Sequence, residues 1–415
     1  MNARAVVTGI GAAAPNGLGT EEYWSAVRDG RSGIGPLTRF DPTHYPSPLA
    51  GEVTGFDPKA YLPARLLPQT DHMTRMALVA ADWALADARV QSAEVGEFDM
   101  GVVTASSSGG FEFGQKELQS LWSKGSEHVS AYQSFAWFYA VNTGQISIRN
   151  GMRGPSGVVV SDQAGGLDAL AQARRHIRRG TEVIVSGGID STLCPWGWVA
   201  LMASDRLSTN NDPARAYVPF DCEASGHVPG EGGAVLVVES GEMARERGAI
   251  SYGEIAGYAA TFDPAPDRGR EPGLRRAIEL ALADADVAAG EIDVVFADAA
   301  GLPDLDQVEA EAIGGVFGYL GVPVTAPKTT TGRLYSGAGA LDVATALLCL
   351  RDGVLPPTVN TRANPVYGLD LVTTVRPAPE ATHALVLGRG QGGFNSAVVL
   401  ATTVSDLSMT QQLRR

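Results

Sequence analysis

A glutamine stands where the surrounding residues are suited to hold a nucleophile. Residues 158–170, VVVSDQAGGLDAL, predict a buried strand, a tight turn of small residues and a helix. Such an elbow exposes the turn residue and directs the positive end of a helix dipole at it, which suits a thiolate or an oxyanion. The turn residue is Gln163, whose carboxamide has a delocalised nitrogen lone pair and no ionisation for the dipole to favour. The segment therefore predicts a scaffold for covalent chemistry without the reactive atom.

The composition is that of an ordinary soluble globular protein. The 415 residues are 44% hydrophobic and 19% charged, which is enough to bury a large core in two domain-sized halves. A formal net charge of −14 argues against a polyanionic partner such as nucleic acid. No apolar run reaches the roughly 18 residues of a membrane span, and the N-terminus enters a strand directly, without a signal peptide. We therefore expect a cytoplasmic protein that binds neither nucleic acid nor a membrane.

The three cysteines are too few and too far apart for a disulfide framework or a zinc site. None of them lies in a strand–turn–helix segment, so we interpret Cys194, Cys222 and Cys349 as unreactive, with Cys349 in an apolar helix over residues 341–350. A nucleophile displaced to Cys194 or Cys222 is an alternative that thiol-directed acylation would test.

Strand-like runs alternate with amphipathic helices along the chain, which predicts a layered α/β protein. Residues 1–250 and 251–415 form two halves of similar rhythm, joined through a polar helical stretch over residues 239–248. A glycine-rich segment at residues 9–14 resembles a dinucleotide fingerprint, but Pro15 follows where the phosphate-binding helix should begin, so we reject it. The expected strands are residues 6–8, 100–104, 158–160, 182–186 and 234–238, then 251–258, 294–296, 384–387 and 397–401.

Several further motifs resemble those of the β-ketoacyl synthases. They are VVTGIG (6–11), PNG (15–17), GRSGI (30–34), PFD (219–221), GEGGA (230–234) and GGFN (392–395). Within that family the chain is most similar to the chain length factor, the ketosynthase β subunit of bacterial type II aromatic polyketide synthases. That similarity lies in SFAWFYAVNTGQ (134–145), PWGW (195–198) and TTTGRLYS (329–336). The resemblance covers about residues 4–402 and implies a thiolase-type fold: two pseudo-symmetric halves, five alternating α-β-α-β-α layers and an obligate dimer.

The residues that carry the family's chemistry are replaced in this chain. Gln163 stands in place of the cysteine nucleophile, while Asp298 and Arg333 stand in place of the two catalytic histidines. Gln391 replaces the phenylalanine that gates the active site. Asp298 would repel the enolate formed when a malonyl thioester loses CO2, and a permanently charged guanidinium cannot act as a neutral imidazole. The resemblance therefore implies no catalytic residue, only these four replaced positions.

Other ionisable residues receive structural interpretations. Glu309 and Lys328 match an acid and base that the family retains, and we expect them to form an ion pair that orders the loop. The run RRHIRR at residues 174–179 is interpreted as compensation of a helix dipole on a solvated face, with a docking patch for an acyl carrier protein as the alternative. Gln163 is expected to cap its helix or to bond across the pocket. The histidines fall in no catalytic position and are interpreted as structural or exposed: His44, His72, His128, His176, His227 and His383.

The resemblance implies a non-condensing subunit in an obligate heterodimer with an active ketosynthase α subunit. The pair would enclose a poly-β-ketone that grows on a phosphopantetheinylated acyl carrier protein from malonyl units, and this chain would set its length. No cofactor or metal of the chain's own is implied. The alternative is a decarboxylase that makes the acetyl primer from malonyl-carrier protein. Loading ketosynthase domains with that activity keep both histidines, however, and this chain keeps neither.

Residues 111–122, FEFGQKELQSLW, have apolar or small residues at helical spacing, which fits a core stripe or a channel wall. In chain length factors the matching helix borders the channel, and bulky side chains there block the growing chain. The resemblance makes Phe111 a bulky wall, whereas Gly114 and Leu118 match positions where shorter-chain members carry larger side chains. We therefore predict a longer, decaketide-like product. Trp196 and Gly197 lie in an expected interface loop, where we interpret them as packing residues that also line the channel.

Overall fold

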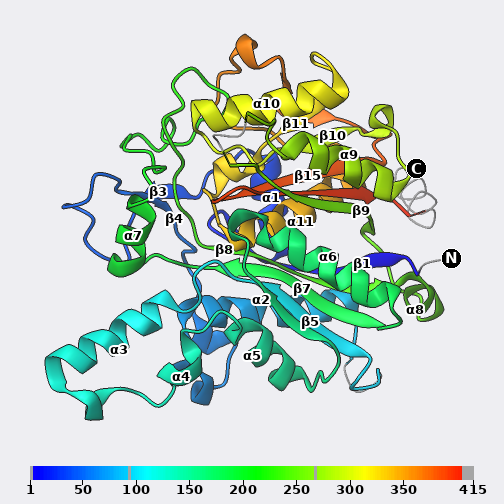
Figure 1. Ribbon diagram of the computed structural model, residues 1–415. Helices are drawn as coiled ribbons and strands as arrows, with labels where there is room; N and C mark the ends of the chain where they lie inside the picture. Colours follow the sequence, from blue (N-terminus) through cyan, green and yellow to red (C-terminus); the bar gives the residue numbers. More distant parts are fainter. Residues whose placement is uncertain (1–2, 92–94, 266–268, 404–415) are drawn as a thin grey trace.

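Two stacked sheet layers form the centre of the computed structural model, which describes residues 3–91, 95–265 and 269–403 (Figure 1). The layers are continuous through a pairing of β1 with β9 in a sheet of twelve strands. The first half contributes β1 (Ala5–Ala14), β5 (Met100–Ala105), β6 (Ser156–Val159), β7 (Val183–Asp190) and β8 (Gly232–Ser240). The second contributes β9 (Gly253–Phe262), β10 (Val294–Phe296), β11 (Pro323–Thr325), β15 (His383–Gly390) and β16 (Phe394–Ala401).

The two halves share one topology. Their strand orders are β1-β8-β7-β5-β6 and β9-β16-β15-β10-β11, so both follow the pattern first, fifth, fourth, second, third. The directions also match, because the first two pairings in each half are antiparallel and the last two are parallel. The predicted pseudo-symmetry is confirmed.

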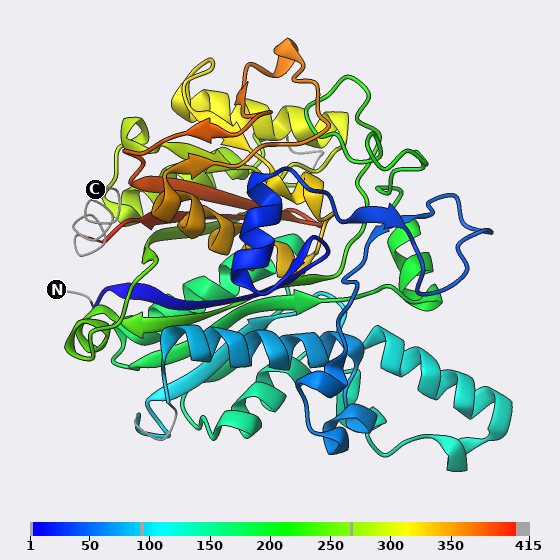
Figure 2. The same ribbon diagram turned by 180° about the vertical axis from the view of Figure 1, so that it is seen from behind.

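Helices cover both outer faces of the stacked sheets and fill the space between them (Figures 1 and 2). Helices α2 (His72–Ala88) and α5 (Val141–Asn150) pack on the first sheet layer, and α9 (Leu274–Ala285) on the second, with α10 (Pro303–Phe317) beside it. Between the layers lie α6 (Gly165–Arg178) and α11 (Ser336–Asp352). The predicted five layers are therefore present. The other helices are α1 (Thr20–Arg28), α3 (Phe111–Lys124), α4 (Gln133–Ala136), α7 (Pro195–Met202) and α8 (Gly241–Glu246).

The middle layer is the most tightly packed part of the core. Every residue of α11 from Ser336 to Leu350 is buried, as expected for a helix that is apolar on all sides. α6 and α11 approach each other through glycines: a Cβ placed on Gly166 would lie 2.5 Å from the Ala340 nitrogen, and one on Gly339 would lie 3.0 Å from the Leu167 backbone. Only glycine permits this separation at those two positions.

Some elements differ from the expected ones. The segment around Trp196 is the helix α7 rather than a loop, because Pro195 takes the first helical position, where its missing N–H has no consequence. The expected helix over residues 239–248 is shorter, since β8 runs on to Ser240. Among the described residues, no helix combines the length and apolar character needed to cross a bilayer. Short strands were not expected: β2 (Gly17–Leu18), β3 (Ile34–Pro36), β4 (Leu49–Gly51), β12 (Val354–Leu355), β13 (Asp370–Leu371) and β14 (Arg376–Pro377).

Candidate functional site

The predicted elbow is present at the entry to α6. β6 ends at Val159, a short 3-10 turn spans Asp162–Ala164, and α6 begins at Gly165. Asp162 has a backbone φ of 51°, in the left-handed region that non-glycine residues seldom adopt. Its carboxylate accepts a hydrogen bond from the Gln391 N–H at 2.8 Å, which ties the turn to the loop that carries the gate position.

Gln163 is buried at this turn. Its side chain is 1% exposed, which corrects the expectation that the elbow presents it to the surface. Neither amide atom has a hydrogen-bond partner within residues 3–91, 95–265 and 269–403. The expectation that Gln163 caps α6 or bonds across the pocket is therefore wrong, because both amide atoms are buried and without a partner among the described residues. The first turn of α6 is held instead by Asp168, which accepts from the Ser161 and Tyr258 hydroxyls at 2.5 and 2.9 Å.

Asp298 and Arg333, the residues expected at the two histidine positions, pair with each other. Nη2 of Arg333 lies 2.9 and 2.8 Å from the two carboxylate oxygens of Asp298, and Nη1 donates to the Asp298 carbonyl at 3.0 Å. Both side chains are buried. Burial disfavours the charged form of Arg333, but Asp298 outweighs it and raises the arginine's pKa above its ordinary value. The guanidinium is therefore satisfied by a protein carboxylate and is not free to stabilise an anionic intermediate.

Two buried carboxylates of α10 fix the loop that carries Asp298. Glu309 accepts from the N–H groups of Asp298 and Ala299 at 2.6 and 2.8 Å, and Asp306 accepts from the Gly301 N–H at 2.9 Å. Burial, with repulsion from Asp298 as the second cause, raises the pKa of Glu309 to about 7. Burial raises the pKa of Asp306 to about 6. The loop is thus ordered by backbone hydrogen bonds to acids.

The expected ion pair between Glu309 and Lys328 is not formed in the described part of the chain. Both oxygens of Glu309 face backbone N–H groups, whereas Nζ of Lys328 lies 2.8 Å from Oδ2 of Asp342 on α11 and donates to the Ala297 carbonyl. The two residues order neighbouring segments through separate partners.

A pocket of about 190 Å³ lies between the elbow turn and the helices α3 and α7. Its lining includes Asp162 from the turn, Arg333 and Gln391 from two of the four positions expected to be replaced, and Phe111 and Gly197 from the two helices. Of the residues predicted to border a channel, these two therefore reach the pocket.

His227 and Tyr335 also line this pocket and were not predicted as site residues. Nε2 of His227 lies 3.4 Å from the Tyr335 hydroxyl, and burial, followed by the charge of Arg333, lowers the pKa of His227 well below its ordinary value. The imidazole is thus neutral near pH 7. In the sequence, the signal that points to His227 as a site residue is its position just before the motif at residues 230–234. Cys194 and Cys222 are not among the described residues of the lining, and burial raises the pKa of Cys194 to about 11.

Helices α3 and α7 bring the other predicted channel residues together. The rings of Phe111 and Trp196 have centroids 4.5 Å apart, and the backbone N–H of Trp196 donates to Oε1 of Gln115 at 2.7 Å. A Cβ placed on Gly114 would lie 3.4 Å from Cζ3 of Trp196 and 3.7 Å from Cβ of Trp137. Gly114 therefore faces two tryptophans across a gap that a single methyl group fills.

The apolar residues in the outer part of α3 are not buried, so they do not form the core stripe that their helical spacing would also fit. Within α3, all of which is described, only Gly114 is buried, and Leu118 is half-buried. Leu121 and Trp122 are 36% and 79% exposed. These two apolar side chains at the outer end of α3 are thus left exposed by the described part of the chain.

The C-terminal end of α6 corrects another expectation. Arg174 is buried rather than solvated: its Nη1 lies 2.5 Å from Oδ2 of Asp284 on α9. The helix thus joins the two halves of the fold through an ion pair. A solvated face is confirmed only for the outer members of the run, such as Arg175 and Arg179.

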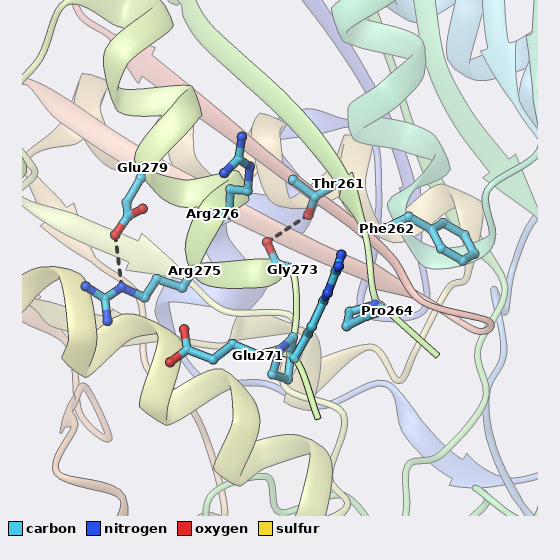
Figure 3. Close-up of a pocket in the computed structure, with 10 residues that line it drawn as sticks. Thr261, Phe262, Pro264, Glu271, Gly273, Arg275, Arg276 and Glu279 are labelled. Atoms are coloured by element: carbon cyan, nitrogen blue, oxygen red, sulfur yellow. Dashed lines mark hydrogen bonds and ion pairs between the residues drawn. The ribbon is translucent and has the colours of Figure 1, made fainter. Parts of the chain in front are cut away.

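A second hollow of about 740 Å³ lies at the start of α9 (Figure 3). Arg275 pairs there with Glu279 at 2.9 Å, and the Thr261 hydroxyl donates to the Gly273 carbonyl at 2.8 Å. Its described lining contains no cysteine, serine or histidine, so the pocket at the elbow remains the candidate site.

The stacked halves and the elbow helix between them define the thiolase-type ketosynthase class. Residues 2–244 match the family described as beta-ketoacyl synthase, N-terminal domain, and residues 252–362 match its C-terminal domain. An actinorhodin polyketide putative beta-ketoacyl synthase 2 from Streptomyces coelicolor is 60% identical over 397 residues, 95% of this chain and 98% of the relative. The tetracenomycin polyketide synthase ketoacyl synthase beta subunit from Streptomyces glaucescens is 60% identical over 398 residues, 95% and 97% of the two chains.

A solved structure, the ishigamide ketosynthase/chain length factor, has a TM-score of 0.87 at 29% identity and covers 97% of this chain and 100% of its own. The chain therefore belongs to the β-ketoacyl synthase family, and within it to the ketosynthase β subunits, or chain length factors, of type II polyketide synthases.

Proposed function

We propose that this chain is the non-condensing subunit of a ketosynthase heterodimer and sets the length of a poly-β-ketone in aromatic polyketide biosynthesis. The partner is an active ketosynthase α subunit, whose cysteine holds the growing chain, while a phosphopantetheinylated acyl carrier protein delivers malonyl units. One observation carries the proposal: at the two histidine positions this chain has a closed ion pair between Asp298 and Arg333. With Gln163 in the cysteine position, carbon–carbon bond formation belongs to the partner.

The same ion pair argues against independent decarboxylation of a malonyl thioester. Loss of CO2 leaves an enolate, which needs preorganised donors or a free cation beside it. Arg333 already binds Asp298, and the carboxylate of Asp298 would repel the enolate. Neither Gln163 nor His227, which is neutral near pH 7, supplies a compensating charge.

Exposed aromatic side chains beside α3 support a partner subunit. We call Tyr132, Phe135, Trp137, Phe138 and Trp196 the aromatic patch; each is 36% to 50% exposed. These residues lie just before α4, on α4, on the segment after it and on α7, around the end of the molecule where α3 projects (Figures 1 and 2). Large aromatic surface of this kind marks interaction sites, and aromatic residues are enriched in the centres of interfaces. The occupant that we propose is the ketosynthase α subunit.

The wall formed by α3 and α7 sets the product length. The tilted rings of Phe111 and Trp196 contact each other at one end of it, and Gly114 leaves room for a methyl group, so a larger side chain would press on Trp196 or extend past it. Each extension adds two carbons, so removing one bulky side chain admits one or two further units before the chain meets a wall. We therefore propose a decaketide-like product.

The test is coexpression with the cognate ketosynthase and analysis of the products. Gly114→Thr combined with Leu118→Phe should give shorter polyketides while condensation continues, because the added atoms extend toward Trp196 and into the channel. Gly114→Ala is the matched control: its Cβ lies at ordinary contact distance and should leave the length unchanged. An unchanged product length in the double variant, with the heterodimer intact, would refute the role of α3.

The complex is proposed to act in the cytoplasm, without nucleic-acid or membrane partners. The net charge of −14 supports the exclusion of nucleic acid. Within the chain, we place the division between the halves at residues 250 and 251, between the end of α8 and the start of β9.

A further inference from the structure

Helix α3 begins without a cap of its own, because the residue before it is Gly110. The first N–H groups of a helix have no partners inside the helix. A carboxylate from another element supplies one: Oδ2 of Asp71 accepts from the Phe113 N–H at 2.7 Å. Oδ1 of the same side chain accepts from the Met73 N–H at 2.8 Å, as the N-cap of α2. Asp71, only 2% exposed, therefore caps two helices at once.

Asp71 also packs against the backbone where α3 starts. A Cβ placed on Gly110 would lie 3.1 Å from Cβ of Asp71 and 2.2 Å from the Ala136 carbonyl oxygen. The backbone at residue 110 is thus confined between the start of α2 and α4. Because α2 packs on β1 and β8, Asp71 connects the position of α3 to the core of the first half.

A second contact holds the same turn of α3. Nη2 of Arg39 donates to Oε2 of Glu112 at 2.7 Å, and Nη1 donates to Oε1 of Glu231 at 3.4 Å. Glu231 is completely buried and also accepts from the Val53 N–H and the Ser191 hydroxyl. Burial works against the charge on Arg39, but Glu231 and Glu112 outweigh it and raise its pKa. Arg39 is therefore a permanently charged bridge from the core to the first turn of α3.

We infer that Asp71 is a positioning residue for product length: it acts through α3 and does not touch the growing chain. The inference rests on the proposed function of α3 as a channel wall. Phe111, which lines the pocket, lies in the turn that Asp71 and Arg39 hold, and Gly114 follows at its end. Since a Cβ on Gly114 would already lie at contact distance, 3.4 Å, from the Trp196 ring, a displacement of α3 changes the spacing of this wall as a side chain larger than alanine does.

Asp71→Asn in the intact heterodimer tests the inference. The amide keeps the size of the side chain but leaves one acceptor oxygen for two N–H groups. Complex yield and total condensation should stay within about twofold of the parent. The ratio of minor to major product lengths should rise by about fivefold, the factor that corresponds to a lost helix cap of ~1 kcal/mol.

Glu112→Gln is the second variant. The Glu112 side chain is 26% exposed, so the change weakens the Arg39 bridge without disturbing the core. If the Asp71→Asn heterodimer does not assemble, Glu112→Gln tests the inference in its place. Its product ratio should change in the same direction. Asp57→Asn is the matched control, because Asp57 is an exposed cap that accepts from the Lys59 N–H within its own short turn at Pro58–Ala60. Its product ratio should equal that of the parent.

Unchanged ratios in the assembled Asp71→Asn and Glu112→Gln complexes would overturn the inference, as would an equal change in Asp57→Asn. Gly114→Thr with Leu118→Phe in the same assay separates the two proposals. If that variant shortens the products while the positioning variants leave the ratio unchanged, the inference alone fails. If it leaves the length unchanged, α3 is not the wall and both proposals fail.

Discussion

Replacing Arg333 with methionine should destabilise the protein strongly, because it leaves a buried carboxylate without its cation. Asp298 is 1% exposed and would lose both guanidinium contacts, keeping only backbone donors such as the Arg389 N–H at 2.8 Å. Removing one partner of a buried ion pair costs about 3–5 kcal/mol, since the uncompensated charge stays in the interior. We expect Arg333→Met to lose stability by about this amount.

The double variant Asp298→Asn, Arg333→Met isolates the contribution of the charges. Neutral groups of similar volume in place of a buried ion pair are often close to neutral for stability. The double variant should therefore recover most of the loss and fall short of the parent by ~1 kcal/mol, the usual value of one hydrogen bond. This strong non-additivity is the signature of direct coupling between the two side chains.

Thermal unfolding of the purified heterodimer measures these differences. At about 2.1 cal/mol/K of unfolding entropy per residue, the 415 residues of this chain give ~0.9 kcal/mol per degree, so Arg333→Met should lower the Tm of the transition in which this chain unfolds by roughly 3–6 °C. Arg275→Met is the matched control, because its partner Glu279 lies one turn away and their side chains are 48% and 51% exposed. Such pairs contribute about 0.3–0.5 kcal/mol, which corresponds to less than about 1 °C. A Tm loss in Arg333→Met no larger than in Arg275→Met would refute the reasoning.

Two further predictions concern buried polar groups. Gln163→Met should raise the Tm by roughly 1–3 °C, because a thioether of similar size replaces a buried amide without partners, whose desolvation costs about 1–3 kcal/mol; condensation by the heterodimer should continue, and a lowered Tm would show that the amide is bonded. Glu309 has a folded pKa of about 7 against an ordinary value of 4.5, so the stability it contributes is present below about pH 4.5 and is lost as the pH rises through about 7. Glu309→Gln should flatten that part of the Tm profile, and equal slopes in parent and variant would contradict the assignment.

Much of the fold could be predicted because its central strands are buried on both faces and read as continuous apolar runs. Residues 234–238 lie within β8, and residues 294–296 coincide with β10. Strand β11 is not predicted because Pro323–Thr325 begins with proline and ends with threonine, whereas the equally short β10 is a continuous apolar run. At α7 the sequence predicts a loop because Pro195 and Gly197 are typical helix breakers, although proline is favourable at the first helical position.

From the sequence, candidate site positions can be named one by one, but their contacts cannot. Motifs placed Asp298 and Arg333 in the histidine positions, yet nothing in their separation of 35 residues indicates that they bind each other. Lys328 likewise pairs with Asp342 because α11 passes beside it in the fold, a fact that no local pattern contains. The unpaired state of Gln163 depends on every neighbour of the turn, so it too required the three-dimensional structure.

The glycine contact between α6 and α11 makes the elbow inseparable from the framework of the molecule. A side chain at Gly166 or Gly339 would force apart two central helices and, with them, the sheets that they hold. At positions 163, 298 and 333, by contrast, the chemistry depends on the side chains, and these can be exchanged while the backbone stays in place. A subunit built this way can give up its reaction and still keep the contours of a ketosynthase. In the heterodimer that we propose, those contours let a catalytic ketosynthase of the same fold pair with this chain by a rotation of about half a turn, with only the partner reactive.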